Sequence, residues 1–377
     1  MKIVVLGTRG FPHVQGGVEA HCENLYPQLV EKGHEVIVFT RKPYVDLAIS
    51  EYKGVTLIPL PCFRNKFLEA FFHTFIGIFA ARKISPDILH VHAIGPSLYI
   101  PLARFLGLKV VMTNHGPDYK RKKWNILAKA VLKTGERFGS KWANSIICIS
   151  ETIATHVREK YHRYVTVIPN GVIIPQILQS DMMLRKYGLI KRRFLLAVGR
   201  FVPEKGFHDL INAFNQLSVQ YPYLLTEKWK LVIAGRADHE DSYSAGLKAC
   251  TQENNNIILT GFVTGKSLQE LYSNAGLFVL PSYYEGLPIV LLEALSYGLS
   301  CVVSDIPANR EVALNNDRFF KVGHVESLVA KIREFINNPL SEAEKTRQIS
   351  MIREKYNWEK IAAMTMDVYR RVHNGIS

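Results

Sequence analysis

Short, almost continuous apolar runs rich in valine and isoleucine recur along the chain. In the first half they are KIVVLG (2–7), EVIVFT (35–40), VTLIPL (55–60), ILHVH (88–92), KVVMTN (109–114) and SIICIS (145–150). In the second half they are FLLAVGR (194–200), KLVIAGR (230–236), NIILTGF (256–262), LFVLPS (277–282) and SCVVSD (300–305). Strands of this kind are typical of a parallel sheet that helices cover on both faces.

Segments with a helical pattern separate these runs, and the first of them ends at Gly33, a residue suited to a helix C-terminus. The alternation predicts an α/β fold with two Rossmann-like, doubly wound domains that face a cleft. The turn sequence VIPNGV closes the first series. We therefore expect domains at 1–175 and 176–357, a hinge near 170–190, and a last helix at about 358–377 that packs back on the first domain.

Two glutamates interrupt one otherwise apolar stretch, YYEGLPIVLLEAL (283–295). Burying an ionised carboxylate without a partner costs on the order of several kcal/mol. The pattern places Glu285 in the turn after a strand and Glu293 two turns into the following helix, with Pro288 in the first turn. The backbone N–H groups of the intervening residues would point at an anion from the helix N-terminus. These residues are Gly286, Leu287, Ile289 and Val290.

A ligand with a phosphate between two hydroxyl-bearing rings would satisfy this arrangement, and a nucleotide sugar has that chemistry. The alternative is one glutamate that interacts with the helix dipole and one on the surface. Arg200 and Lys205 follow another strand, in VGRFVPEKG, and could converge on a diphosphate. They could also be two solvated loop cations.

Two further candidates lie in the first half. Gly16 and Gly17 precede the first helix, where missing side chains let backbone N–H groups approach a phosphate. An ordinary strand-to-helix turn would explain them equally well. His115 follows a strand in VVMTNHGPDY and could bind a substrate hydroxyl or phosphate, or act only as a loop or capping residue. His90 and His92 also end a strand and are weaker candidates.

Composition narrows the class of protein. The chain has 377 residues, is 47% hydrophobic and 21% charged, and has five scattered cysteines without a C-x-x-C pair. This favours reduced, buried thiols in a cytoplasmic protein and gives no zinc or redox motif. No apolar run is long enough to span a membrane, and the N-terminus is not typical of a signal peptide.

The net charge of +14 is uneven. Residues 1–175 have 23 Lys and Arg against 12 Asp and Glu, which gives 23 − 12 = +11. Residues 176–377 have 24 against 21, which gives 24 − 21 = +3. The first half is therefore suited to an anionic partner such as a membrane surface, a phosphorylated ligand or nucleic acid. Because no nucleic-acid-binding motif is present, we expect no nucleic-acid partner.

Taken together, these motifs resemble the family 4 retaining glycosyltransferases of GT-B architecture, over nearly the whole chain. The resemblance rests on the Gly16–Gly17 loop, VIPNGV, VGRFVPEKG with its two cations, and the E-x7-E from Glu285 to Glu293. GTRGFPHVQGGVEAHCENL and NHGPDYKRKKW further resemble a bacterial branch that builds capsule, O-antigen or exopolysaccharide.

The resemblance implies a role for each matched residue. Arg200 and Lys205 would hold the donor diphosphate and stabilise the leaving charge, together with the 286–290 segment that includes Pro288. Glu293 would accept hydrogen bonds from the ribose, and Glu285 from the transferred sugar. Gly16 and Gly17 would approach the donor from the first domain, and His115 would lie near the donor sugar and the acceptor. No D-x-D triplet occurs, so we expect no metal and no other cofactor.

The alternatives are a sugar epimerase or phosphorylase of the same architecture, and a nucleotide-sugar or nucleic-acid binder without activity.

Two stretches indicate peripheral binding to the inner face of an anionic membrane, where the protein would reach a lipid-linked glycan acceptor. FRNKFLEAFFHTFIGIFAARK (63–83) is aromatic with basic ends, and could equally be a core helix. The basic cluster Lys120, Arg121, Lys122 and Lys123 lies between Tyr119 and Trp124, aromatics suited to the headgroup level, and could equally be a solvated face.

Overall fold

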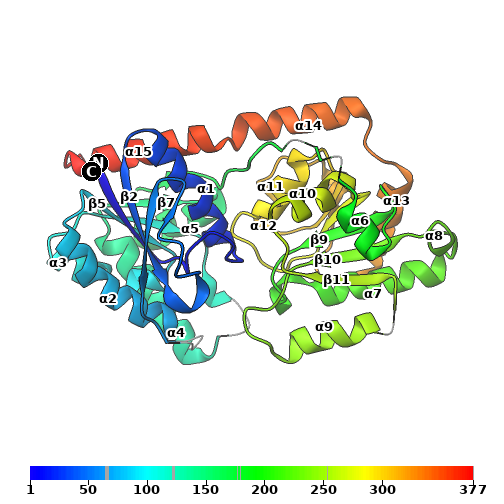
Figure 1. Cartoon of the computed structure of the whole chain (residues 1–377), viewed down its shortest axis with the longest axis horizontal. Coiled ribbons are helices and arrows are strands. Elements are labelled where there is room, and N and C mark those ends of the chain that lie inside the picture. Colours follow the sequence, from blue (N-terminus) through cyan, green and yellow to red (C-terminus); the bar gives the residue numbers. More distant parts are fainter. Residues whose placement is uncertain (64–67, 121–123, 176, 179, 253, 377) are drawn as a thin grey trace. The chain divides into compact units, whose positions relative to one another are not determined.

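The computed structural model describes residues 1–63, 68–120, 124–175, 177–178, 180–252 and 254–376 (Figure 1). The chain forms two compact units. Unit 1 comprises Met1–Gly171 and Trp358–Ser377, and unit 2 comprises Val172–Asn357. The boundary thus lies within VIPNGV, four residues before the predicted position. The last helix, α15 (Trp358–His373), belongs to unit 1 and packs beside α1 (Gly17–Glu31).

Unit 1 contains a sheet with the strand order β3-β4-β2-β1-β5-β6-β7-β8, in which every pair is parallel except β3 with β4. The strands are β1 (Lys2–Leu6), β2 (Glu35–Arg41), β3 (Glu51–Tyr52), β4 (Val55–Leu60), β5 (Ile88–His92), β6 (Val110–Asn114), β7 (Ser145–Cys148) and β8 (Thr166–Val167). The sequence did not predict β3. It forms because Lys53 and Gly54 both adopt positive φ, which suits a two-residue hairpin turn.

Helices cover both faces of this sheet. They are α1, α15, α2 (Glu69–Ile84), α3 (Ile100–Phe105), α4 (Ile126–Trp142) and α5 (Glu151–Tyr161). One face carries alternate residues of β1 and β2, such as Ile3, Val5 and Val38, and is buried by α1 and α15. α15 presents Ile361, Ala362, Met366, Val368, Tyr369 and Val372 to this core. Their spacing of three and four residues matches one face of a helix, which explains why the C-terminal segment returns to unit 1.

Unit 2 contains a fully parallel sheet with the strand order β11-β10-β9-β12-β13-β14. The strands are β9 (Phe194–Val198), β10 (Lys230–Ala234), β11 (Ile257–Gly261), β12 (Leu277–Leu280), β13 (Cys301–Ser304) and β14 (Phe319–Phe320). This is the 3-2-1-4-5-6 order of a Rossmann-like domain. The predicted pair of doubly wound domains is therefore confirmed, although the two-residue β14 was too short to be predicted.

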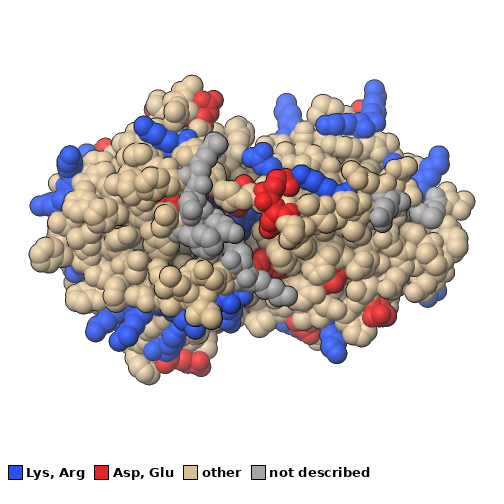
Figure 2. Space-filling view, turned by 90° about the horizontal axis from the view of Figure 1, so that it is seen from below, with Lys and Arg blue, Asp and Glu red and all other residues tan. Residues whose placement is uncertain are grey.

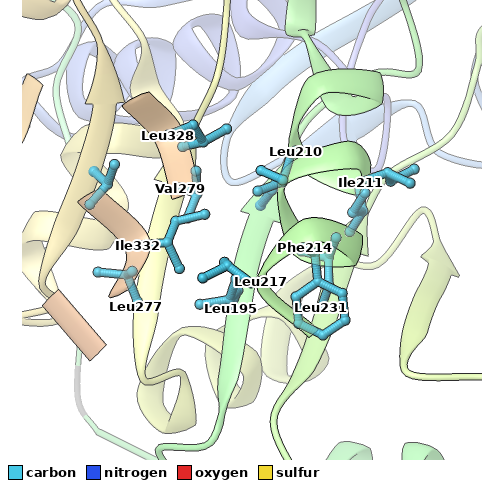
Figure 3. Packing of buried hydrophobic residues seen from close by; sticks show 14 of the residues in the cluster. Leu195, Leu210, Ile211, Phe214, Leu217, Leu231, Leu277, Val279, Leu328 and Ile332 are labelled. Atoms are coloured by element: carbon cyan, nitrogen blue, oxygen red, sulfur yellow. The ribbon is translucent and has the colours of Figure 1, made fainter. Parts of the chain in front are cut away.

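The core of unit 2 lies between this sheet and two helices, α7 (Phe207–Gln220) and α13 (Val325–Asn337) (Figure 3). Alternate strand residues such as Leu195, Leu231 and Val279 point toward these helices because side chains alternate between the faces of a strand. α7 contributes Leu210, Ile211, Phe214 and Leu217, and α13 contributes Leu328 and Ile332. Each fully buried side chain of this size stabilises the fold by roughly 1.5–3 kcal/mol.

The remaining helices of unit 2 are α6 (Met182–Tyr187), α8 (Tyr223–Thr226), α9 (Ser242–Gln252), α10 (Gly265–Asn274), α11 (Ile289–Ser296), α12 (Pro307–Arg310) and α14 (Glu342–Lys355). Within the described part of the chain, no helix is both long and apolar enough to cross a bilayer. The expectation that all five cysteines are buried is wrong. Cys22, Cys148 and Cys301 are buried, but Cys62 is half-buried and Cys250 is exposed on α9.

Candidate functional site

The topology of unit 2 defines where a ligand should bind. β9 lies between β10 and β12, so the strand order reverses direction between β9 and β12. Ligands of open α/β sheets bind beyond the carboxyl ends of the strands at this reversal. Arg200 and Lys205 follow β9, and Glu285 follows β12. Three of the predicted site residues therefore lie on the two loops that flank the reversal point.

These two loops pack against each other, and Gly206 makes the contact possible. It adopts φ +66°, and a Cβ atom there would lie 2.2 Å from the carbonyl oxygen of Pro281. The backbone N–H of Tyr283 donates to the carbonyl of Glu204 at 2.8 Å. Replacing Gly206 would force the loops apart. The close approach places Lys205, on one loop, next to Glu285, on the other.

Glu285 is fixed through one carboxylate oxygen. Oε1 accepts hydrogen bonds from Ser282 Oγ at 2.6 Å and from Lys205 Nζ at 2.7 Å, and the side chain is 10% exposed. Ser282 is itself held, because the buried hydroxyl of Ser304 donates to its carbonyl at 2.5 Å. Among the described residues, none contacts Oε2 of Glu285 by a hydrogen bond. A rigid carboxylate thus presents one oxygen to a ligand.

The helix after Glu285 begins later than the sequence indicated. Pro288 is the residue before α11, with β-region dihedrals, rather than part of the first turn. Glu293 is consequently the fifth residue of α11, just over one turn in, and not two turns in. The first N–H groups of the helix belong to Ile289 and Val290. The N–H groups of the first turn of a helix have no carbonyl partner within that helix. Gly286 is half-buried and Leu287 is buried, and both lie in the loop that leads to this N-terminus.

Glu293 shares the geometry of Glu285. Its Oε2 accepts a hydrogen bond at 2.9 Å from the hydroxyl of Tyr272, which is almost fully buried and stacks on Tyr297 with ring centroids 5.2 Å apart. No hydrogen bond to Oε1 occurs within the described residues. Burial raises the pKa of Glu293 to about 7, although the Tyr272 hydrogen bond lowers it. Both glutamates therefore have one oxygen held by the protein and one open.

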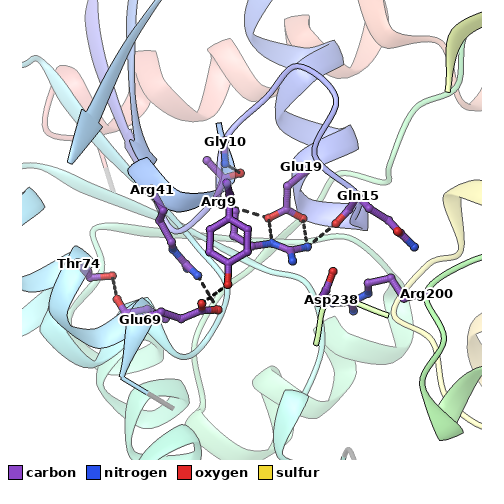
Figure 4. Close-up of polar contacts among 12 residues, drawn as sticks. Arg9, Gly10, Gln15, Glu19, Arg41, Glu69, Thr74, Arg200 and Asp238 are labelled. Atoms are coloured by element: carbon purple, nitrogen blue, oxygen red, sulfur yellow. Dashed lines mark hydrogen bonds and ion pairs between the residues drawn. The ribbon is translucent and has the colours of Figure 1, made fainter. Parts of the chain in front are cut away.

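Arg200 and Lys205 each pair with a carboxylate. Arg200 Nη1 donates to Asp238 Oδ2 at 2.9 Å (Figure 4), and Lys205 pairs with Glu285. An ammonium group has three donors and a guanidinium has five, so these hydrogen bonds use only part of the capacity of either side chain. The structure thus shows two positioned cations rather than solvated ones, since their side chains are 19% and 17% exposed.

In unit 1, the loop after β1 is shaped by a buried ion pair (Figure 4). Arg9 Nε lies 3.2 Å from Glu19 Oε1, and Arg9 also donates to the carbonyl of Gln15. Burial raises the pKa of Glu19, but the charge and hydrogen bonds of Arg9 outweigh it and leave the pKa below its usual value. A Cβ at Gly16, where φ is +156°, would lie 2.0 Å from Glu19 Oε2. A Cβ at Gly17 would meet nothing within 4 Å. Gly16 is thus required by packing, whereas Gly17 leaves open space at the start of α1.

His115 follows β6 and lies in a cluster of buried aromatic and imidazole side chains. Its Nε2 lies 2.9 Å from Nδ1 of His92, which is fully buried at the end of β5. Burial, followed by the neighbouring His21 and His90, holds the pKa of His115 well below its usual range. His115 is therefore a neutral imidazole at physiological pH. The sequence ranked His90 and His92 below His115, but the structure joins all three in one network.

The basic stretch of unit 1 is described only at its ends, because Arg121, Lys122 and Lys123 lie outside the described residues. Lys120 is exposed and Trp124 is half-buried. The expectation that Tyr119 faces a membrane is wrong, since its ring is 9% exposed and its hydroxyl donates to Glu136. The buried Glu136 also accepts from Lys160 at 3.0 Å and Tyr161 at 2.7 Å.

Several residues of the site were not found by sequence reasoning. Asp238, Ser282 and Tyr272 hold Arg200, Glu285 and Glu293, respectively. None of them belongs to a recognisable sequence motif, and Tyr272 lies 21 residues from its partner Glu293. Asp238 could have been predicted from its position after β10, because β10 is the neighbour of β9 in the sheet and parallel strands end at the same edge.

Two Rossmann-like units, with polar residues at the strand reversal of unit 2, are the architecture of the GT-B glycosyltransferases. Two models of known protein families match the sequence. The family model described as Glycosyltransferase Family 4 matches residues 15–174, and the model described as Glycosyl transferases group 1 matches residues 183–354. The chain belongs to the family 4 glycosyltransferases.

Individual relatives agree with this placement. An uncharacterised glycosyltransferase of Methanocaldococcus jannaschii is 27% identical, with 98% of each chain aligned. The UDP-Gal:alpha-D-GlcNAc-diphosphoundecaprenol alpha-1,3-galactosyltransferase of Escherichia coli is 29% identical over 62% of this chain and 62% of that protein. Anabaena HepE, solved in complex with UDP-glucose, has a TM-score of 0.79 at 17% identity, covering 98% of this chain and 100% of that chain. The structural match shows a shared fold.

Proposed function

We propose that this glycosyltransferase transfers a hexose with retention of configuration and without a metal, from a nucleoside diphosphate sugar to a lipid-linked glycan of a cell-surface polysaccharide. The observation that carries the donor assignment is the matched state of Glu285 and Glu293. Each has one oxygen held by the protein and one that accepts no hydrogen bond from a described residue. Because carboxylate oxygens accept hydrogen bonds strongly, the open oxygens are suited to hydroxyl groups.

The two carboxylates flank the N-terminus of α11, where a diphosphate would be stabilised by backbone N–H groups. In this arrangement Glu293 binds the ribose and Glu285 binds the transferred sugar. Arg200 and Lys205 stabilise the negative charge that develops on the departing diphosphate, which is the main electrostatic demand of the reaction. These cations and N–H groups supply the stabilisation that a metal supplies in other transferases, so the proposal includes no metal.

Unit 1 carries the residues that the family resemblance assigns to the sugar and the acceptor. The open space beside Gly17 and the neutral His115 support these assignments. A neutral imidazole can accept or donate a hydrogen bond without placing a positive charge beside an oxocarbenium-like sugar. The relative from Escherichia coli, whose name specifies a UDP-galactose donor and an undecaprenyl diphosphate-linked acceptor, supports the choice of donor and acceptor class.

The test of the donor site is the release of nucleoside diphosphate from a panel of nucleotide sugars. Glu285→Gln keeps the shape of the side chain but removes its charge, so we expect kcat to fall by on the order of 10²-fold with little change in KM. Glu326→Gln, an exposed glutamate on α13, is the matched control and should behave as wild type. Wild-type activity in Glu285→Gln would remove this carboxylate from the mechanism. Products of epimerisation without transfer would favour the alternative enzyme class.

Membrane binding by unit 1 is the second part of the proposal. α2 buries His73, Gly77 and Ile78 but leaves Phe75 and Phe79 each 42% exposed, with ring centroids 5.2 Å apart. Arg82 and Lys83 are exposed at its end. Lys and Arg side chains also gather along one edge of the unit 1 surface in Figure 2. The helix is thus both part of the core and a source of exposed aromatic rings. Residues 64–67 of the predicted interfacial segment lie outside the described residues.

Flotation with liposomes of varied anionic lipid content tests this part. Binding should rise with anionic lipid and fall with salt, because each cation near the surface contributes about 1 kcal/mol. Changing Lys120, Arg121, Lys122 and Lys123 to Ser should release the protein. The matched control changes four exposed cations of unit 2, Lys228, Lys321, Arg347 and Arg353, to Ser. A wild-type protein that stays unbound at low salt would refute membrane docking and favour a soluble acceptor.

A further inference from the structure

Behind His115, a chain of hydrogen bonds crosses the interior of unit 1. Nδ1 of His92 contacts Nε2 of His115 at 2.9 Å, and Nε2 of His92 contacts the hydroxyl of Tyr26 at 2.5 Å. His90 continues the chain. Its Nδ1 lies 2.5 Å from the hydroxyl of Tyr369 and 2.9 Å from that of Tyr26, and its Nε2 lies 2.7 Å from Thr113 Oγ1. The chain therefore connects α1, β5, β6 and the C-terminal helix α15.

Every member of this chain except His115 is at most 1% exposed. Burial lowers the pKa of His90 to about 3 and holds that of His92 well below its usual range. Burial likewise raises the pKa of Tyr26 well above its usual value. The imidazoles and phenols are consequently all neutral. Each imidazole then has one N–H donor and one acceptor nitrogen, and each phenol has one O–H to donate.

One arrangement of these protons fits the contact lengths. A phenol O–H is a more acidic donor than a neutral imidazole N–H, and the two shortest contacts each join a phenol to an imidazole nitrogen. In this arrangement Tyr369 donates to Nδ1 of His90, and the proton of His90 lies on Nε2 and is donated to Thr113. Tyr26 donates to Nε2 of His92. The longer contact, from Tyr26 to His90, carries no proton in this arrangement.

The proton of His92 then lies on Nδ1 and is donated to Nε2 of His115. The proton of His115 must lie on its other nitrogen, Nδ1, for which no hydrogen-bond partner exists among the described residues. We propose that Tyr26 is a positioning residue that acts through His92 to keep Nδ1 of His115 protonated, so that His115 meets its ligand as a neutral hydrogen-bond donor. The ligand group would be an acceptor oxygen, from a sugar hydroxyl or a phosphate; this assignment rests on the proposed function.

The packing around His115 keeps the ring in one orientation. His21 lies edge-on to it, with ring centroids 5.2 Å apart, and His21 in turn contacts Trp358 at the start of α15 at 5.5 Å. Nδ1 of His21 bonds Oδ1 of Asn170 at 3.0 Å, so that His21 is itself fixed. α15 thus contributes Trp358 to the packing and Tyr369 to the hydrogen bonds. This helix supports the geometry of His115 in addition to closing the core.

The direct test is the tautomer of His115 in the full-length protein without ligand, measured by long-range 1H–15N correlation with labelled histidine. The signal is assigned by its loss in His115→Gln. The wild type should show protonated Nδ1. Tyr26→Phe removes the donor to His92 and should move His115 toward the tautomer protonated on Nε2. Tyr52→Phe, which removes a hydroxyl bonded to Glu23 at 3.2 Å, is the matched control and should leave the tautomer unchanged.

A wild-type His115 protonated on Nε2 would overturn the proposal without any variant, and so would an unchanged tautomer in Tyr26→Phe. Kinetics supply a second readout. Tyr26→Phe should lower kcat/KM about tenfold in the wild-type background, the effect of one lost hydrogen bond, and should have no further effect in His115→Ala. An equal loss in both backgrounds would indicate a structural role alone. If the wild type transfers no sugar but shows the expected tautomer, the proposed function fails while the positioning role of Tyr26 is upheld.

Discussion

Replacing Glu293 with glutamine should change how the stability of unit 2 depends on pH. Burial raises the pKa of Glu293 from its ordinary value of 4.5 to about 7. The protonated carboxyl can still interact with Tyr272, whereas the charged form has lost hydration that one phenol hydroxyl does not replace. Glutamine retains the shape and the hydrogen-bonding capacity but cannot ionise.

The magnitude follows from the two pKa values. A group with a higher pKa in the folded state stabilises the fold most at low pH, and this contribution is lost as pH rises through the folded-state value. With 4.5 for the unfolded chain and about 7 for the folded protein, the loss is about 2.5 kcal/mol between pH 5 and pH 8. The wild type should lose this amount relative to Glu293→Gln, because other titrating groups cancel in the comparison.

Urea unfolding, followed by far-UV circular dichroism at pH 5 and pH 8, measures the difference between the variant and the wild type. The transition of unit 2 must be resolved, since two units need not unfold together. Glu326→Gln, an exposed glutamate, should show no comparable pH dependence. If the difference between Glu293→Gln and wild type is the same at both pH values, the carboxyl is not held in a site that disfavours its charge.

The same carboxyl should couple nucleotide binding to proton release. A ribose that donates hydrogen bonds to Oε1 favours the ionised form, so the pKa of Glu293 should fall on binding. At pH 7 about half of the carboxyls are protonated in the free protein, and binding should release about half a proton. Isothermal titration with a nucleoside diphosphate in two buffers of different ionisation enthalpy measures this number. Release that persists undiminished in Glu293→Gln would assign the proton to another group.

Four other predictions concern the cations, the need for a metal, the glycine loop and the buried carboxylate of unit 1. Arg200→Ala and Lys205→Ala should each cost on the order of several kcal/mol of transition-state stabilisation, the effect of removing one preorganised charge, and the double variant should cost less than the sum of the two. The kcat/KM values of the three variants test this. Full additivity would contradict binding of one shared diphosphate. Chelators should leave wild-type transfer intact, whereas a strict need for added Mg²⁺ would contradict the metal-free proposal. Gly17→Ala should weaken donor use with little change in melting temperature, because its Cβ meets no protein atom, while Gly16→Ala should also lower stability. Glu136→Ala should destabilise unit 1 by roughly 1.5–3 kcal/mol, because two tyrosine hydroxyls and Lys160 lose their shared charged acceptor. A difference in unfolding free energy below 1 kcal/mol, about that of an ordinary surface pair, would show that the buried carboxylate is dispensable.

The sheets could be predicted because strands buried on both faces leave continuous apolar runs. Strands of two residues, such as β3 and β14, leave no such run and were missed. The positions of Glu285, Arg200 and Lys205 after strands were also readable, since strand ends converge at one edge of a parallel sheet. Local pattern therefore located the loops of the site.

The pairings within the site were not predictable in the same way. Lys205 and Glu285 are 80 residues apart, and His90 and Tyr369 are 279 residues apart. Such contacts depend on how whole elements pack, and no local pattern encodes them. The same reason explains Tyr119, whose place beside basic residues indicated a membrane surface. Its hydroxyl instead reaches Glu136, which three other side chains also contact.

In the proposed mechanism, the loops after β9 and β12 form a donor site in which Glu285 offers one open oxygen to the transferred sugar. The most direct measurement compares single-turnover transfer by wild type and Glu285→Gln, with a saturating nucleotide sugar and an undecaprenyl diphosphate-linked saccharide in detergent. We expect both proteins to bind the nucleoside diphosphate with similar affinity and Glu285→Gln to transfer on the order of 10²-fold more slowly. Equal transfer rates, or loss of nucleotide binding without loss of the transfer rate, would contradict it.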